Sequence, residues 1–135
     1  MSRRLAREVA LRVLFQVDVG KANWQAALER SLKEVPLSPV QQEFGRQLVE
    51  GVINHQQEID RLISRFAIDW TLDRMANVDR NVMRIALFEI LYLKDIPPSV
   101  SINEAVELAK KYGDQDSGKF VNGILGNVVR HVDQS

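Results

Sequence analysis

The sequence predicts an all-α fold of about seven helices, arranged as two small helical subdomains that share one core. Apolar residues recur at helical spacing along most of the chain, and no segment shows the strict alternation that is typical of a strand. Proline, glycine and N-capping residues separate these segments. The stretch from Asp79 to Leu93 is apolar around most of its girth, which indicates a helix at the centre of the fold.

With 135 residues, the chain can form one domain that buries roughly two thirds of the surface that it exposes when unfolded. We expect an N-terminal helical half over about residues 1–67 and a C-terminal half over about residues 78–135. The connection between them, from Ile68 to Asn77, should hold one helical turn at most. Trp70, Leu72 and Met75 should anchor this connection to the core, with the tryptophan pinning it.

The first two helices have clear boundary signals. The first is predicted from residue 3 to about residue 19, with Ser2 as its N-cap and Gly20 as its stop. Asn23 should cap a second, short helix that ends before Pro36. Each boundary therefore rests on residue types that favour helix ends.

A long third helical segment begins at a nearly unambiguous signal. Ser38 is an N-cap, Pro39 occupies the first helical position, and Gln41 completes a capping box. Apolar positions then continue at helical spacing for roughly thirty residues. A shift in their phase predicts a break near Asn54 and His55.

The helix after the central one also has start and stop signals. Pro97 and Pro98 should end the central helix, and Ser101 with Glu104 predicts a capping box for the next. Gly113 should close that helix as a left-handed C-cap.

The last helix is predicted from near Asp116 to about Val132. Gly123 and Gly126 lie inside it, and each costs roughly 1 kcal/mol relative to alanine in a helix. The pair therefore suggests that another backbone crosses this helix closely.

The charge is balanced overall but concentrated at the start of the chain. Eighteen basic and eighteen acidic residues cancel, whereas residues 1–12 carry four arginines against Glu8 alone, a net charge of +3. Any binding to nucleic acid must therefore come from a local patch. Arg4 and Arg7 share a helix face and could hold successive phosphates. A simple solvated helix end remains the alternative.

A second candidate binding segment surrounds the start of the last helix. Asp116 can cap this helix, and Lys119 lies in its first turn, where a cation opposes the macrodipole. Backbone N–H groups there point toward any bound anion. Simple capping is the alternative for Asp116, and a place in the core is the alternative for Phe120.

No residue pattern typical of catalysis is present. The chain has no cysteine, its two histidines, His55 and His131, are isolated, and the paired carboxylates Glu104 and Glu107 read as a solvated ion-pair face. We therefore expect no enzyme activity, no cofactor and no metal site. Without a leader peptide or an apolar run of about eighteen residues, we expect a cytoplasmic protein with no membrane partner.

The long motifs of the chain resemble those of a known family. The runs DRNVMRIALFEIL, VSINEAVELAKKYG and KFVNGILG, together with the opening RRLAREVALRVLFQ, are similar to the signature of the NusB family of bacterial transcription antitermination factors. The resemblance implies a non-catalytic protein of two helical subdomains. It also implies binding to the boxA sequence of single-stranded RNA together with NusE, a protein of the small ribosomal subunit. The complex would help RNA polymerase to read through terminators, notably in ribosomal RNA operons.

The resemblance also implies roles for particular residues. Six residues match the RNA-contacting positions of the family: Arg3, Arg4, Arg7, Asp116, Lys119 and Phe120. Phe15 and Asp79 fall where the family faces NusE. Two positions depart from the pattern, since Phe15 replaces a frequent tyrosine and Gly126 replaces a frequent acidic residue.

Two other functions remain open from the sequence. An adaptor that contacts only protein would use Phe15 and Asp79 but not the arginines. The second alternative is an enzyme that modifies ribosomal RNA, because NusB-like domains also occur fused to RNA methyltransferases. The sequence leaves open whether the protein is a monomer or a homodimer.

Overall fold

The computed structural model describes residues 3–134, with side chains as far as Val132, and these residues form six α-helices and one short 3-10 turn. The helices are α1 (Arg4–Gly20), α2 (Trp24–Glu34), α3 (Pro39–Phe66), α4 (Asn77–Tyr92), α5 (Pro98–Tyr112) and α6 (Ser117–Gln134), with the turn η1 (Leu72–Arg74) between α3 and α4. The predicted all-α fold is confirmed, and no strand occurs in the described range. The division into two subdomains stays a prediction.

The ends of α1 and α2 follow local signals. The predicted N-cap Ser2 lies outside the described residues. Helix α1 ends at Gly20, one residue later than expected, and its C-cap is Lys21, which has a left-handed φ of 54°. The side chain of Asn23 accepts a hydrogen bond from the N–H of Ala26, which confirms it as the cap of α2.

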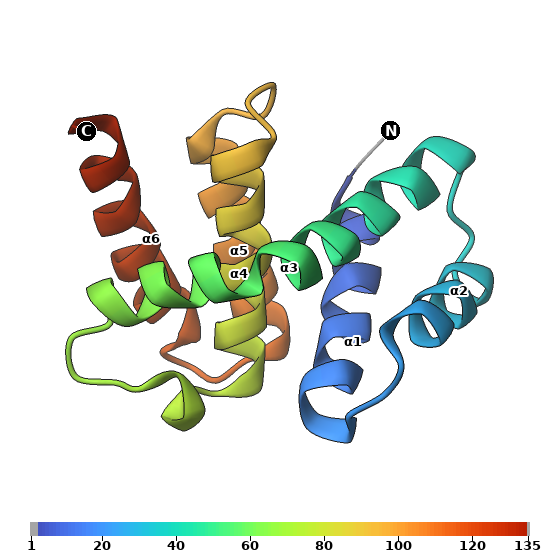
Figure 1. Ribbon diagram of the computed structural model, residues 1–135. Helices are drawn as coiled ribbons and strands as arrows, with labels where there is room; N and C mark the ends of the chain where they lie inside the picture. The colour runs from blue at the N-terminus through green and yellow to red at the C-terminus, as the bar shows by residue number, and fades with distance from the viewer. Residues whose placement is uncertain (1–2, 135) are drawn as a thin grey trace.

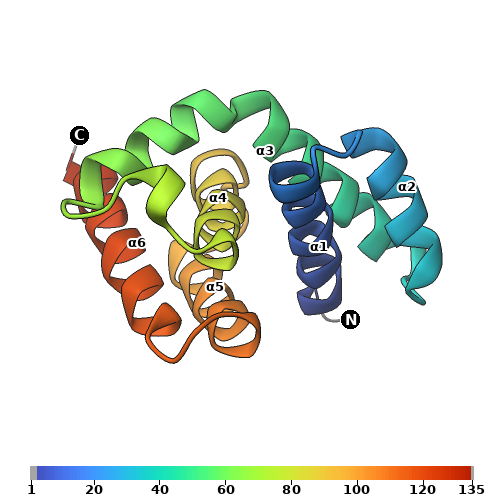
Figure 2. The ribbon, with the colours of Figure 1, turned by 90° about the horizontal axis from the view of Figure 1, so that it is seen from below.

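The long helix α3 crosses the other helices and is kinked. Ser38 and Gln41 form the predicted reciprocal capping box. His55 has non-helical angles (φ −121°, ψ 17°), which confirms the predicted break. Figures 1 and 2 show α3 passing over both α1 and α4. Because Phe88 packs directly on the backbone of α3, a Cβ at Gly51 would overlap its ring.

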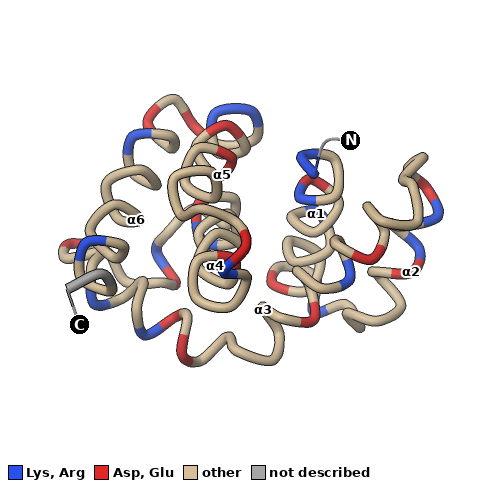
Figure 3. Tube along the Cα trace, turned by 90° about the horizontal axis from the view of Figure 1, so that it is seen from above, with Lys and Arg blue, Asp and Glu red and all other residues tan. Residues whose placement is uncertain are grey.

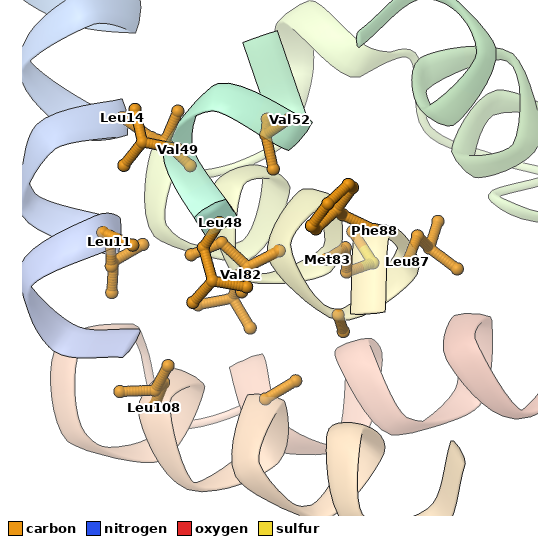
Figure 4. Close-up of a cluster of buried hydrophobic side chains, with 14 of the residues drawn as sticks. Leu11, Leu14, Leu48, Val49, Val52, Val82, Met83, Leu87, Phe88 and Leu108 are labelled. Carbon is orange, nitrogen blue, oxygen red and sulfur yellow. The ribbon is translucent and has the colours of Figure 1, made fainter. Parts of the chain in front are cut away.

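Helix α4 is the centre of the fold, as predicted. Every residue from Asp79 to Ile90 is buried, because α1, α3, α5 and α6 all pack against this helix. Figure 4 shows side chains of four helices gathered in the core: Leu11 and Leu14 of α1, Leu48 of α3, Val82 and Met83 of α4, and Leu108 of α5.

The predicted capping box of α5 is wrong. The helix begins at Pro98, so Ser101 and Glu104 lie inside it rather than at its start. The Ser101 hydroxyl donates to Glu89 of α4, and Glu104 pairs with Arg4 of α1. Gly113 follows the helix with φ −100°, so the predicted left-handed C-cap is also wrong.

Two predictions about packing are wrong as well. Trp70 is 51% exposed and does not pin the connection, whereas the other two expected anchors do reach the core, Met75 as a buried side chain and Leu72 packed against it. A Cβ at Gly123 would meet no atom within 4 Å, so no backbone crosses α6 there. The tight contact at a helical glycine occurs instead at Gly51, where the neighbour is the ring of Phe88 rather than a backbone.

Candidate nucleic-acid interface

The first arginines of α1 reach toward the second half of the chain. The guanidinium of Arg4 makes hydrogen bonds of 2.6 and 3.2 Å to the carboxylate of Glu104 on α5. Arg3 lies 3.8 Å from Asp95, in the loop between α4 and α5. Both arginine side chains are about half exposed, so both can meet a ligand in solvent. The hydrogen bond from Arg4 is the largest cause that lowers the pKa of Glu104.

Arg7 behaves differently from Arg3 and Arg4. It is 4% exposed, and its guanidinium makes two hydrogen bonds of 2.8 Å to Glu89, which is itself buried. The hydroxyl of Ser101 adds a third hydrogen bond to Glu89. Arg7 therefore joins α1 to α4 and does not present its charge at the surface.

Lysines of α5 and α6 extend the surface that Arg3 and Arg4 begin. Figure 3 shows the start of α1, the end of α5 and the start of α6 along one side of the molecule, and Figure 2 agrees. We call the exposed cations of these three helix ends the basic face: Arg3, Arg4, Lys110, Lys111 and Lys119.

Packing and ion pairs connect the basic face. The Cγ of Lys110 lies 3.0 Å from where a Cβ of Gly118 would be, so the lysine stem lies against the first turn of α6. Lys111 pairs with Glu8 of α1 at 2.6 Å. No spacing rule in the sequence could relate Lys110 and Lys111 to α1 and α6.

The other predicted RNA-contacting residues line a pocket. Asp116 and Phe120 contribute to a hollow of about 410 Å³ together with Trp70, Arg74 and Asp79. The rings of Trp70 and Phe120 meet edge to face, with centroids 6.2 Å apart. We call this hollow the aromatic-acidic pocket. Lys119, between Asp116 and Phe120 in sequence, is exposed and does not line this hollow.

Asp79 is the buried acid of the aromatic-acidic pocket. It is 8% exposed, and its Oδ1 has no hydrogen-bond partner. Burial raises the pKa of Asp79, a hydrogen bond from Ser117 opposes this shift, and the charge of Asp114 adds to it. The structure therefore places Asp79 beside the predicted RNA-contacting residues Asp116 and Phe120.

Phe15, the other predicted partner contact, lies in a separate groove. Its ring is 42% exposed and lines a hollow of about 490 Å³ with Leu5, Val35, Val78 and Tyr112. Val78 precedes Asp79 in α4, so the groove and the aromatic-acidic pocket lie on either side of the start of that helix. At the groove, Glu8 accepts hydrogen bonds from Lys111 and Tyr112.

The search for metal-ligand clusters and membrane spans covered only the described residues. No group of three or more histidine, cysteine, aspartate or glutamate side chains there could hold a metal ion. None of the described helices has the length and apolarity that a membrane crossing requires.

The fold is all-helical, and its surface carries a basic face, an apolar groove and a pocket of aromatic and acidic side chains. These features are typical of a small helical protein that binds other macromolecules. Residues 4–130 match the NusB family, and the chain belongs to that family.

Similar proteins agree with this assignment. The chain is 51% identical to the transcription antitermination protein NusB of Desulforamulus reducens, covering all of this chain and 94% of that protein. It is 48% identical to the protein of the same name from Bacillus subtilis, covering both chains completely. Its fold is similar to a chain in a crystal structure of the antitermination factors NusB and NusE in complex with dsRNA, with a TM-score of 0.88, 31% identity and 96% of each chain covered.

Proposed function

We propose that this protein is a non-catalytic transcription antitermination factor that binds RNA together with NusE. The basic face is the observation that carries this proposal, because it gathers exposed cations from three helices on a chain with no net charge. The names of the similar proteins support it, since they are antitermination factors and one is described in complex with NusE and dsRNA. In finer detail, the RNA is a boxA-type single strand, and the complex promotes read-through by RNA polymerase in ribosomal RNA operons in the cytoplasm.

The RNA would contact the basic face through its phosphates. Arg3, Arg4 and Lys119 are exposed and can each approach a phosphate oxygen. Phosphate contacts position RNA without reading its sequence, so these residues set affinity and salt dependence. Arg7 supports them indirectly, because its bonds to Glu89 fix α1 against α4.

The protein partner would occupy the groove around Phe15. An exposed aromatic ring beside Val78 and Tyr112 gives this groove an apolar centre, which is typical of the anchor of a protein interface. The groove adjoins the basic face through the Lys111–Glu8 pair. NusE bound there would therefore lie next to the RNA and could add contacts to the same strand.

A titration of labelled boxA-like RNA, with and without NusE and at several salt concentrations, tests this function. We expect weak binding by the protein alone and tighter binding with NusE. The variant Arg3→Ala, Arg4→Ala, Lys119→Ala should bind more weakly at low salt. A control that removes three exposed cations elsewhere, Arg30→Ala, Lys33→Ala, Arg65→Ala, should bind as the wild type.

The test also separates the proposal from a protein-only adaptor. If the wild type binds no RNA with or without NusE while Phe15→Ala abolishes NusE binding, the adaptor is the correct function. Loss of RNA binding in the first variant alone supports the antitermination factor.

A further inference from the structure

Arg3, at the start of α1, lies over an aromatic ring of α3. Its guanidinium carbon is 4.7 Å from the centroid of the Phe44 ring. The two helices come close here, because a Cβ at Gly45 would lie 3.8 Å from the carbonyl oxygen of Ala6. Phe44 is 6% exposed, so the close packing of the core fixes its ring. The ring is therefore a rigid platform for a cation of the neighbouring helix.

This ring contact differs from the ion pair that holds Arg4. The guanidinium of Arg4 donates two hydrogen bonds to Glu104, so those N–H groups are already in use. Arg3 lies 3.8 Å from Asp95, which is beyond hydrogen-bond distance, and both of these side chains are exposed. An exposed pair of this kind contributes little. A contact with a ring uses none of the guanidinium donors, so Phe44 can hold Arg3 while its N–H groups stay available to a phosphate.

The ring also leaves the charge of Arg3 intact. The negative face of an aromatic ring attracts a guanidinium through the quadrupole of the ring and does not neutralise the cation, as a carboxylate does. An arginine side chain has many rotamers, and a ligand that immobilises it must offset the lost conformational entropy. A guanidinium that already rests on a ring loses less of this freedom when RNA binds. The contact with Phe44 therefore preorganises Arg3.

A place in the core is the simple explanation for Phe44, because the ring is part of the buried apolar cluster. Arg7 also approaches this ring, with its guanidinium carbon 5.3 Å from the centroid, but Arg7 is bound to Glu89 and is buried. Core packing depends on the shape of the ring, whereas the attraction of Arg3 depends on the electron density of its face. An experiment can change the second property and keep the first.

We propose that Phe44 is a positioning residue for RNA binding, whose ring holds the guanidinium of Arg3 at the basic face with its charge and donors directed to a phosphate. Phe44 acts through Arg3 and does not itself contact RNA. The inference rests on the proposed RNA binding and adds to it a residue of α3, a helix that contributes no cation to the basic face.

Fluorination of the Phe44 ring tests this role. A trifluorinated phenylalanine at position 44 keeps nearly the same shape, but its fluorine atoms withdraw electron density from the ring face and weaken the attraction for a cation. The affinity for labelled boxA-like RNA, measured with NusE at low salt, should fall roughly twofold to fivefold. Urea denaturation of the same protein measures any loss of stability.

The chain offers a matched control at the other end of α3. The guanidinium carbon of Arg65 lies 5.5 Å from the centroid of the Phe66 ring, so this pair has a similar geometry away from the basic face. The same fluorinated residue at position 66 should leave the RNA affinity unchanged.

A double-mutant cycle with Arg3 assigns the effect. Arg3→Ala alone should weaken RNA binding, because it removes a phosphate contact. In the Arg3→Ala background, the fluorinated ring at position 44 should cause no further loss, since the guanidinium that it holds is absent. This coupling between the two positions is a result that a purely structural role of Phe44 would not produce.

Four results would overturn the inference. An equal loss of affinity in both backgrounds would show that the ring acts through core packing or Arg7. Tighter binding by the fluorinated protein would show that the ring withholds Arg3 from RNA. No effect of fluorination, in a protein that Arg3→Ala weakens, would leave Phe44 with its place in the core alone. If the wild type bound no RNA with or without NusE, the proposed function itself would fail, and the inference with it.

Discussion

Arg7 and Glu89 form a buried, bidentate ion pair that connects the first helix to the central one, with both N–O distances at 2.8 Å. The family resemblance groups Arg7 with Arg3 and Arg4 as an RNA contact. The geometry instead gives it a positioning role, since its charge is fully used inside the protein. This distinction changes how variants of the three arginines should be interpreted.

The first prediction concerns this pair. Arg7→Ala would leave the carboxylate of Glu89 buried without its partner, so the free energy of unfolding should fall by about 3–5 kcal/mol. Urea denaturation measures this change. The double variant Arg7→Met, Glu89→Leu should recover much of the loss, because it buries no charge. A stable Arg7→Ala protein that binds RNA poorly would make Arg7 a direct contact instead.

The second prediction concerns competition for Arg4. Glu104 holds the guanidinium of Arg4, so a phosphate must replace this carboxylate to bind there. Glu104→Gln should therefore raise RNA affinity at low salt and steepen its salt dependence. Glu29→Gln, which removes a similar pair with Arg46 far from the basic face, is the control and should change neither. Weaker RNA binding by Glu104→Gln would show that the pair positions Arg4 rather than masking it.

The third prediction uses the pH dependence of stability. Burial tends to raise the pKa of Asp18, but hydrogen bonds from Arg80 and Asn81 and the charge of Arg84 outweigh it, so this pKa is lowered. The stability contributed by Asp18 is therefore complete above its unfolded pKa, near 3.8, and is lost as the pH falls through the lower folded value.

Asp18→Asn provides the comparison. Its free energy of unfolding should be about 2 kcal/mol below that of the wild type at neutral pH. The difference should shrink as the pH falls below about 4. Urea denaturation at a series of pH values measures it. A difference that stays constant down to pH values of about 2 would mean that the Asp18 charge is not the source.

The fourth prediction compares two glycines in helices. Gly51→Ala should destabilise the protein by about 1–3 kcal/mol or more, because the new methyl group overlaps the ring of Phe88. Gly123→Ala should stabilise it by about 0.5–1 kcal/mol, because it meets no atom within 4 Å and alanine favours helix. Thermal denaturation compares the two. Equal effects would contradict the packing of Phe88 on α3.

Much of the fold could be predicted because its signals are local. The capping residues Asn23 and Ser38 act on backbone groups within three residues, and the phase shift at His55 is visible in a short window. Apolar residues occur on most sides of α4, and this pattern likewise predicts that the helix lies at the centre of the fold. These features require no knowledge of which helices meet.

Features that depend on long-range contacts could not be predicted. Ser101 and Glu104 have the spacing of a capping box, but the tertiary fold uses them to bind Glu89 and Arg4, which are distant in sequence. The burial of Arg7 has the same origin. The aromatic-acidic pocket combines η1, α4 and the start of α6, and neither the exposure of Trp70 nor its contact with Phe120 has a local signal.

The salt dependence of RNA binding tests the central claim most directly. The claim is that the basic face holds RNA through its phosphates. For about three phosphate contacts, the logarithm of the binding constant should fall with the logarithm of salt concentration with a slope of roughly −2. Arg3→Ala, Arg4→Ala, Lys119→Ala should bring this slope close to zero, while the Arg30, Lys33 and Arg65 control keeps it. Equal slopes for the wild type and both variants would contradict the claim.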